Sequence, residues 1–90
     1  MKIKKDFIAR RVAGEWIVVA VGKRSVEFHS LLRLNGSALL LWQTLERGAD
    51  GTALVKALTD AYDVSGERAA EDVKAFVGQL REIGCLEDET

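Results

Sequence analysis

Three helical patterns follow one another between Leu34 and Leu86, and this stretch constrains the fold more than any other part of the chain. In the first pattern, apolar residues recur at i, i+3, i+4 and i+7, as Ala38, Leu41, Trp42 and Leu45. In the third, they fall four, three, four and three residues apart, as Ala69, Val73, Phe76, Leu80 and Ile83. These spacings place one apolar stripe along each helix, which has to be buried. The second carries Leu54, Val55, Leu58, Ala61 and Tyr62. The sequence therefore predicts three helices around one core.

Capping residues define the helix ends. Asn35, Thr52 and Ser65 each precede a helical pattern, and their side-chain oxygens are suited to accept a backbone N–H of the first turn. Gly48 and Gly84 follow the first and third patterns, where a left-handed residue commonly ends a helix. We expect a cap and a stop at these positions.

The residues before the helices are strand-like. Residues 7–12 and 16–21 are rich in β-branched and aromatic side chains and flank Ala13-Gly14-Glu15, which predicts a hairpin with a tight turn. A third strand is expected at about Ser30–Leu34, after a loop or irregular extension at residues 26–29.

Three strands followed by three helices predict an α+β fold, with a three-stranded antiparallel sheet and the helices on one of its faces. The same elements make up a winged helix-turn-helix, so the layout is winged-helix-like. We expect a single domain over residues 1–90, with its core at about residues 7–86 and a frayed acidic tail at 87–90.

Composition excludes several classes of protein. A hydrophobic content of 48% is too high for a disordered chain. The longest early apolar run, Trp16–Val21, is far too short to cross a bilayer, and no apolar segment follows the basic N-terminus as in a signal peptide. The single cysteine, Cys85, cannot form an internal disulfide and favours a reducing compartment. We therefore expect a cytoplasmic protein without a membrane partner.

Charge is unevenly distributed and argues against nucleic acid. Residues 1–24 hold seven basic and two acidic side chains, whereas the helical part is acidic. A winged-helix DNA-binding protein is the main alternative, but Glu67, Glu71 and Asp72 lie on the helix that would enter the groove. We therefore expect no nucleic-acid partner.

The residues of common catalytic and metal sites are also missing. His29 and Cys85 are far apart in the sequence and have no further soft ligand beside them, so a zinc site is not expected. The glycines occur singly, without a phosphate-binding loop. We predict neither enzymatic activity nor a cofactor. Leu39 and Leu40 point away from the stripe of their helix, which leaves a structural domain or a dimerisation domain that forms a homodimer as a further alternative.

The chain resembles the PqqD family, the small peptide-recognition domains also called RiPP recognition elements. Five features in order carry this resemblance: Ala13-Gly14-Glu15 before an apolar strand, the Leu34-Asn35 junction, Ala38-x-x-x-Trp42-x-x-Leu45 with Gly48, Leu54 through Tyr62-Asp63-Val64, and Asp72-Val73-x-x-Phe76-x-x-x-Leu80-x-x-x-Gly84-x-Leu86. They span roughly residues 7–86.

The resemblance implies a noncatalytic peptide chaperone. Such domains bind the leader segment of a ribosomally made precursor peptide and present it to a modifying enzyme, often a radical SAM enzyme. The leader adds as a strand to the edge of the third strand, and its side chains enter a groove against the third helix. On this chain the expected peptide-binding residues are Ser30, Leu31, Leu32, Arg33, Leu34, Ala70, Val73, Lys74, Val77 and Arg81. Ala70, Val77 and Arg81 lie beside the core stripe, and Arg33, Lys74 and Arg81 are suited to pair with acidic leader residues.

Overall fold

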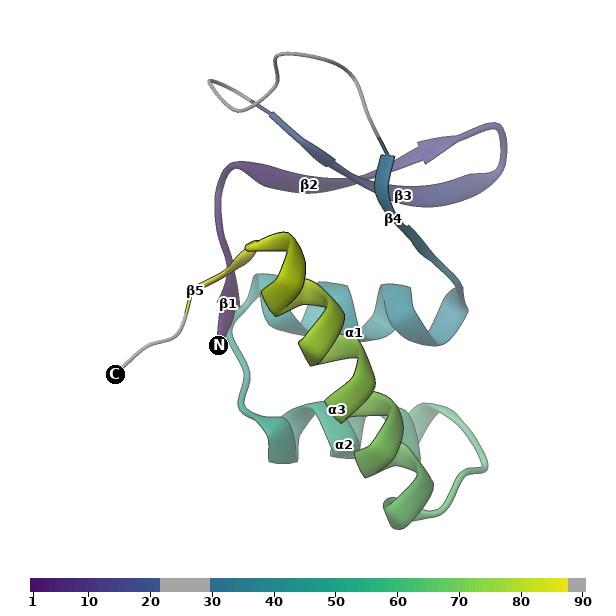
Figure 1. Ribbon diagram of the computed structural model, residues 1–90. Coiled ribbons are helices and arrows are strands. Elements are labelled where there is room, and N and C mark those ends of the chain that lie inside the picture. Colours follow the sequence, from purple (N-terminus) through teal and green to yellow (C-terminus); the bar gives the residue numbers. More distant parts are fainter. Residues whose placement is uncertain (22–29, 88–90) are drawn as a thin grey trace.

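A computed structural model describes residues 1–21 and 30–87, with the side chains of Ser30 and Leu31 left out of the description. The elements in chain order are β1 (Lys2–Ile3), β2 (Phe7–Val12), β3 (Glu15–Ala20), β4 (Ser30–Leu34), α1 (Gly36–Glu46), α2 (Gly51–Ala61), α3 (Gly66–Ile83) and β5 (Leu86–Glu87). The sheet of β2, β3 and β4 forms one layer, and the three helices lie on one side of it (Figure 1). The predicted α+β fold, with three antiparallel strands followed by three helices, is confirmed.

The β2–β3 hairpin turns where the sequence predicts. Val12 pairs with Glu15, which leaves Ala13 and Gly14 as a two-residue loop with φ values of 52° and 83°. Two successive positive φ values match the right-handed twist of the flanking strands, and glycine adopts them without steric cost. Strand β3 then pairs with β4, with Trp16 opposite Leu34 and an irregularity between Val18 and Val19. Strand β4 begins and ends at the predicted residues.

Two of the three predicted helix caps are confirmed. The Asn35 side chain accepts from the Ala38 N–H at 2.9 Å, and the Ser65 hydroxyl accepts from the Arg68 N–H at 3.1 Å. Gly84 ends α3 with φ 83°, as expected.

The predicted cap of the second helix is wrong. Asp50, rather than Thr52, accepts from the Ala53 N–H, at 2.8 Å, and α2 begins at Gly51. Aspartate is an equally good cap, and its negative charge adds a favourable interaction with the positive end of the helix dipole. Thr52 therefore lies inside the first turn.

One core joins the sheet to the helices. From the sheet, Phe7, Val18 and Leu34 enter it, and their burial fixes which face of the sheet the helices cover. The predicted stripe of α3 is confirmed, because Ala69, Val73, Phe76 and Leu80 are buried in this cluster. Trp42 and Leu45 of α1 are fully buried in the same cluster, together with Leu54 of α2. A stable sheet–helix arrangement follows from this shared apolar surface.

A short two-stranded ribbon, which the sequence did not predict, joins the ends of the chain. Strands β1 and β5 pair antiparallel, with Lys2 opposite Glu87 and Ile3 opposite Leu86 (Figure 1). The Lys4 N–H donates to the Cys85 carbonyl at 2.9 Å and extends the pairing. Glu87, expected to fray with the tail, is therefore part of a strand. Two-residue strands give no usable alternation in sequence, which explains the omission.

Two predicted segments include residues that the structure does not describe. The predicted loop or extension at residues 26–29 lies outside the described residues, as do residues 88–90 of the expected frayed tail. Within the described part of the chain, no helix has the length and apolar character needed to cross a membrane.

Candidate functional site

Strand β4 is an edge of the main sheet. Among the described residues its neighbour in the sheet is β3, since the strand order is β2-β3-β4. A strand with one neighbour keeps a row of backbone N–H and C=O groups that can pair with another extended chain. The predicted third strand is thus placed to accept an added strand.

A groove of about 560 Å³, here called the strand–helix groove, lies beside this edge. Strand β4 and the start of α1 form one wall, and α3 forms the other. Its lining residues are Leu32, Arg33, Asn35, Ser37, Ala38, Leu41, Leu58, Arg68, Asp72, Ala75, Phe76 and Gln79.

Apolar and charged side chains divide this groove into floor and rim. Leu41, Leu58 and Phe76 are almost completely buried and supply apolar floor. On the rim, the Arg68 Nε lies 3.3 Å from the Asp72 Oδ1, with both side chains largely exposed. The Arg33 Nε likewise lies 3.5 Å from the Glu15 Oε2. Exposed pairs of this kind contribute under about 1 kcal/mol each. A charged ligand can therefore replace either pair at little cost.

A second groove lies between α2 and α3 and is here called the helix–helix groove. Its volume is about 770 Å³. Its lining residues are Met1, Gly51, Thr52, Val55, Lys56, Thr59, Gly66, Ala70, Val73, Lys74, Val77 and Arg81. No residue of β4 lines it.

The two grooves divide the residues that the sequence predicts for peptide binding. Leu32 and Arg33 line the strand–helix groove. All five predicted residues of α3 instead line the helix–helix groove: Ala70, Val73, Lys74, Val77 and Arg81. Leu34 is buried in the core, and Ser30 and Leu31 are placed by their backbone in β4. The structure therefore does not bring the predicted strand and helix residues into one groove.

Helix geometry explains this division. Successive residues of an α-helix are rotated by about 100°, so a buried stripe has two flanks that face in opposite directions. In α3 one flank, with Ala70, Val77 and Arg81, faces α2, and the other, with Ala75 and Gln79, faces β4. The sequence identified residues beside the stripe but did not indicate which flank meets the strand. It therefore missed Arg68, Asp72, Ala75 and Gln79, for which the only signal was their position on the other flank.

Cys85 has the environment of a structural residue. Its side chain is fully buried, and its thiol donates to the Leu80 carbonyl at 3.5 Å. Burial raises the pKa of the Cys85 thiol above its ordinary value of 9.0, which keeps it protonated at neutral pH. In the part of the chain that is described, no three His, Cys, Asp or Glu side chains are grouped to hold a metal ion. His29, weighed as a ligand from the sequence, lies outside the described residues.

An open strand edge beside a groove with a small apolar floor and a polar, charged rim defines a small α+β domain equipped to bind an extended chain. The family model described as coenzyme PQQ synthesis protein D (PqqD) matches residues 15–86, and the chain belongs to this family. No curated protein matches the sequence.

Two solved structures share the fold. TbiB1, solved in complex with the TbiA(beta) leader peptide, superposes with a TM-score of 0.77 at 20% identity, covering 100% of this chain and 99% of that one. Lasso peptide synthetase B1, complexed with its leader peptide, gives a TM-score of 0.73 at 24% identity, covering 97% and 96% of the two chains.

Proposed function

We propose that this protein is a noncatalytic peptide chaperone that binds the leader segment of a ribosomally made precursor peptide and presents it to a modifying enzyme. The observation that carries the proposal is the position of the open β4 edge directly beside the strand–helix groove. Two structural neighbours with the same fold were solved with leader peptides bound, which supports the same use of the fold here.

The physical basis is strand addition. An extended leader pairs its backbone with β4, and every second side chain then points toward the groove. Backbone pairing supplies affinity with little dependence on sequence, while the apolar floor at Leu41, Leu58 and Phe76 selects leaders with apolar side chains at the matching positions. Ordering a flexible peptide uses roughly 2–5 kcal/mol of the interaction energy. The remaining affinity is moderate, so the leader can be released after modification.

The proposed leader site keeps the predicted strand, Ser30–Leu34, and uses the β4-facing flank of α3. Arg33 and Arg68 on the rim are suited to acidic leader residues, because each already pairs with an exposed carboxylate that a ligand can replace. Ala70, Val73, Lys74, Val77 and Arg81 lie outside this site.

In this proposal the modifying enzyme that receives the leader is a radical SAM enzyme. The protein itself acts in the cytoplasm, which its single, buried cysteine favours. The protein acts as a monomer in this proposal. Leu39 and Leu40, weighed as a dimer surface from the sequence, are half-buried and pack against the core.

Two alanines of α3 provide a matched test. Ala75 and Ala70 are both exposed, but Ala75 lines the strand–helix groove and Ala70 lines the helix–helix groove. Titration calorimetry with a synthetic leader, taken from the precursor encoded beside this gene, should show at least about tenfold weaker binding for Ala75→Trp, a loss of about 1.4 kcal/mol. Ala70→Trp should bind as the unmodified protein does. Equal affinities for all three proteins would contradict the proposed site, and no binding to the unmodified protein would contradict the function.

A further inference from the structure

The helix–helix groove is a second candidate binding surface, separate from the proposed leader site. Its floor is apolar, with Val73 buried and Val55 and Val77 half-buried. Its α3 lining runs from Gly66 to Arg81, which is about four helical turns and roughly 22 Å. Small residues keep it open, since a Cβ added at Gly51 or Gly66 would meet nothing within 4 Å.

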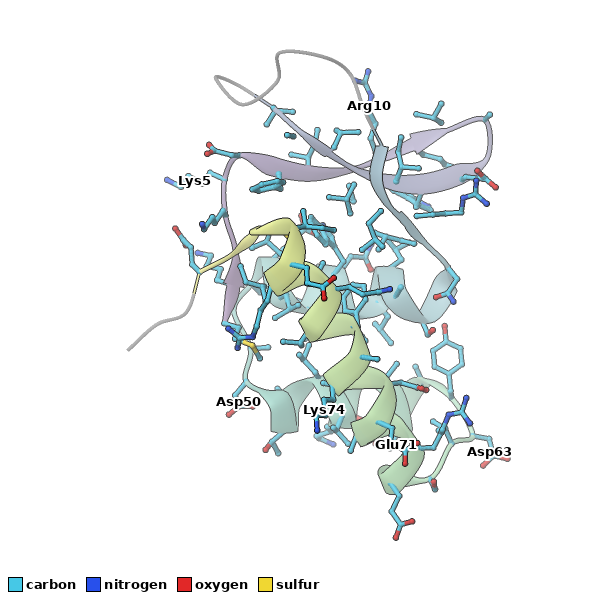
Figure 2. All side chains as sticks on the ribbon, in the orientation of Figure 1. Lys5, Arg10, Asp50, Asp63, Glu71 and Lys74 are labelled. Carbon is cyan, nitrogen blue, oxygen red and sulfur yellow. The ribbon has the colours of Figure 1, made fainter. Side chains whose placement is uncertain are left out.

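The charged residues that line this groove are all basic. Helices α2 and α3 together hold five acidic and four basic side chains. Three of the four basic ones line the groove, and among the described lining residues there is no Asp or Glu. These three are Lys56, Lys74 and Arg81. Figure 2 shows Lys74 where α3 passes over α2, whereas Glu71 lies closer to the N-terminal end of α3. The groove is thus a basic strip on an otherwise acidic helical surface.

All three of these cations have exposed side chains, so an incoming anion can contact them. Lys56 contacts Asp60 at 3.1 Å, but both side chains are largely exposed, and such a pair contributes at most about 0.5 kcal/mol. The Arg81 Nη2 lies 3.6 Å from the Met1 sulfur at the end of the groove, and its side chain is exposed. Lys74 is exposed between them. A row of carboxylates would therefore find complementary charge along the full length of the groove.

The walls determine the conformation of the occupant. Both are helices, whose central backbone groups are already hydrogen-bonded within the helix, so strand addition is impossible here. A helix already satisfies its own backbone and so needs no backbone partner from the walls, and an apolar stripe at i, i+3, i+4 and i+7 fits a groove of four turns.

We infer that the helix–helix groove is a docking site for an acidic amphipathic helix of a partner protein. Because the two grooves lie on opposite flanks of α3, the helix and a leader peptide can be bound at the same time. This inference goes beyond leader binding and does not depend on it.

The test uses two synthetic helical peptides of sixteen residues (a length of about four turns) that share one leucine stripe and differ only in having Glu or Lys beside it. Each is titrated into the isotopically labelled full chain and followed by amide chemical shifts. We expect the Glu peptide to shift amides of Val55, Ala70 and Val77 and to bind at least about tenfold more tightly than the Lys peptide. Ala70→Trp should abolish these shifts, and Lys74→Glu with Arg81→Glu should weaken binding about tenfold or more and reverse its salt dependence, because the groove then repels the peptide's carboxylates.

Ala75→Trp is the matched control and should leave binding of the Glu peptide unchanged. Equal affinity for both peptides, shifts at other residues, or no binding of either would overturn the inference. So would a concentration-dependent dimer of the chain alone that Ala70→Trp dissociates, because the groove would then be occupied by a second copy. Leader titration of the same samples separates the two proposals, since Ala75→Trp should weaken leader binding alone and Ala70→Trp should weaken helix binding alone.

Discussion

Replacing Phe76 with alanine tests how the core and the strand–helix groove share one residue. Phe76 is 7% exposed and belongs to the cluster that also contains Trp42 and Leu80, while its remaining surface lines the groove. Truncating a buried phenylalanine costs about 3–5 kcal/mol through lost burial and the cavity left behind. A chain of 90 residues has a total stability of about 5–13 kcal/mol, so the variant should lose roughly a quarter of it or more.

Denaturant unfolding followed by tryptophan fluorescence measures this loss. Trp42 is completely buried in the same cluster, so its emission reports on the affected core. The midpoint should fall while the slope of the transition stays constant, because the same surface is exposed on unfolding. Val77→Ala is the control: Val77 is half-buried on the other flank of α3, and we expect a loss of only about 1 kcal/mol.

The two variants should separate clearly. If Phe76→Ala lowers the free energy of unfolding by less than about 1 kcal/mol at an unchanged slope, the Phe76 side chain is not packed in the core. Equal losses for Phe76→Ala and Val77→Ala would show that the buried face of α3 has been misassigned, and with it the division of its two flanks between the grooves.

Three further predictions concern the backbone, the thiol and nucleic acid. Gly84→Ala should lower the free energy of unfolding by about 1–2 kcal/mol, because Gly84 has φ 83°. Gly78→Ala, within α3 and with equally open surroundings, should raise it by about 0.5–1 kcal/mol. Thermal unfolding of both variants measures this difference. The pKa of the Cys85 thiol is raised in the folded protein, so the unfolded chain loses this proton first as the pH rises. The contribution of the neutral thiol to the free energy of unfolding is therefore complete below pH 9.0 and declines as the pH rises above it. This decline should be absent when the unfolding of Cys85→Ala is measured over the same pH range. Finally, fluorescence anisotropy at physiological salt should show weak DNA binding without sequence preference, because Glu67, Glu71 and Asp72 lie on α3; a specific nanomolar complex would favour the winged-helix alternative.

Local chemistry made much of the fold predictable from the sequence. The stripe of α3, the caps at Asn35 and Ser65, and the turn at Ala13-Gly14 all follow from the spacing and side-chain chemistry of a few neighbouring residues. The location of β4 followed in the same way. These elements fix the topology because one apolar face of each has to meet the others.

The site was less predictable because it depends on relations between distant elements. Periodicity shows that Ala70 and Ala75 both flank a buried stripe, but only the packing of α3 between β4 and α2 decides which of them faces the strand. The β1–β5 ribbon escaped prediction for a related reason, since each two-residue strand is defined by its partner at the other end of the chain. The choice of Asp50 over Thr52 as a cap is local, but both are good caps and the sequence does not rank them.

Strand addition at β4 is the central claim, and intermolecular NMR contacts test it most directly. A labelled leader peptide from the neighbouring precursor is added to the full chain, and backbone contacts between the two are recorded. We predict a ladder of backbone contacts between the leader and Ser30–Leu34, with leader side-chain contacts to Ala75 and Gln79. A leader that contacts only the helix–helix groove, only Leu39 and Leu40, or no part of the protein would contradict it.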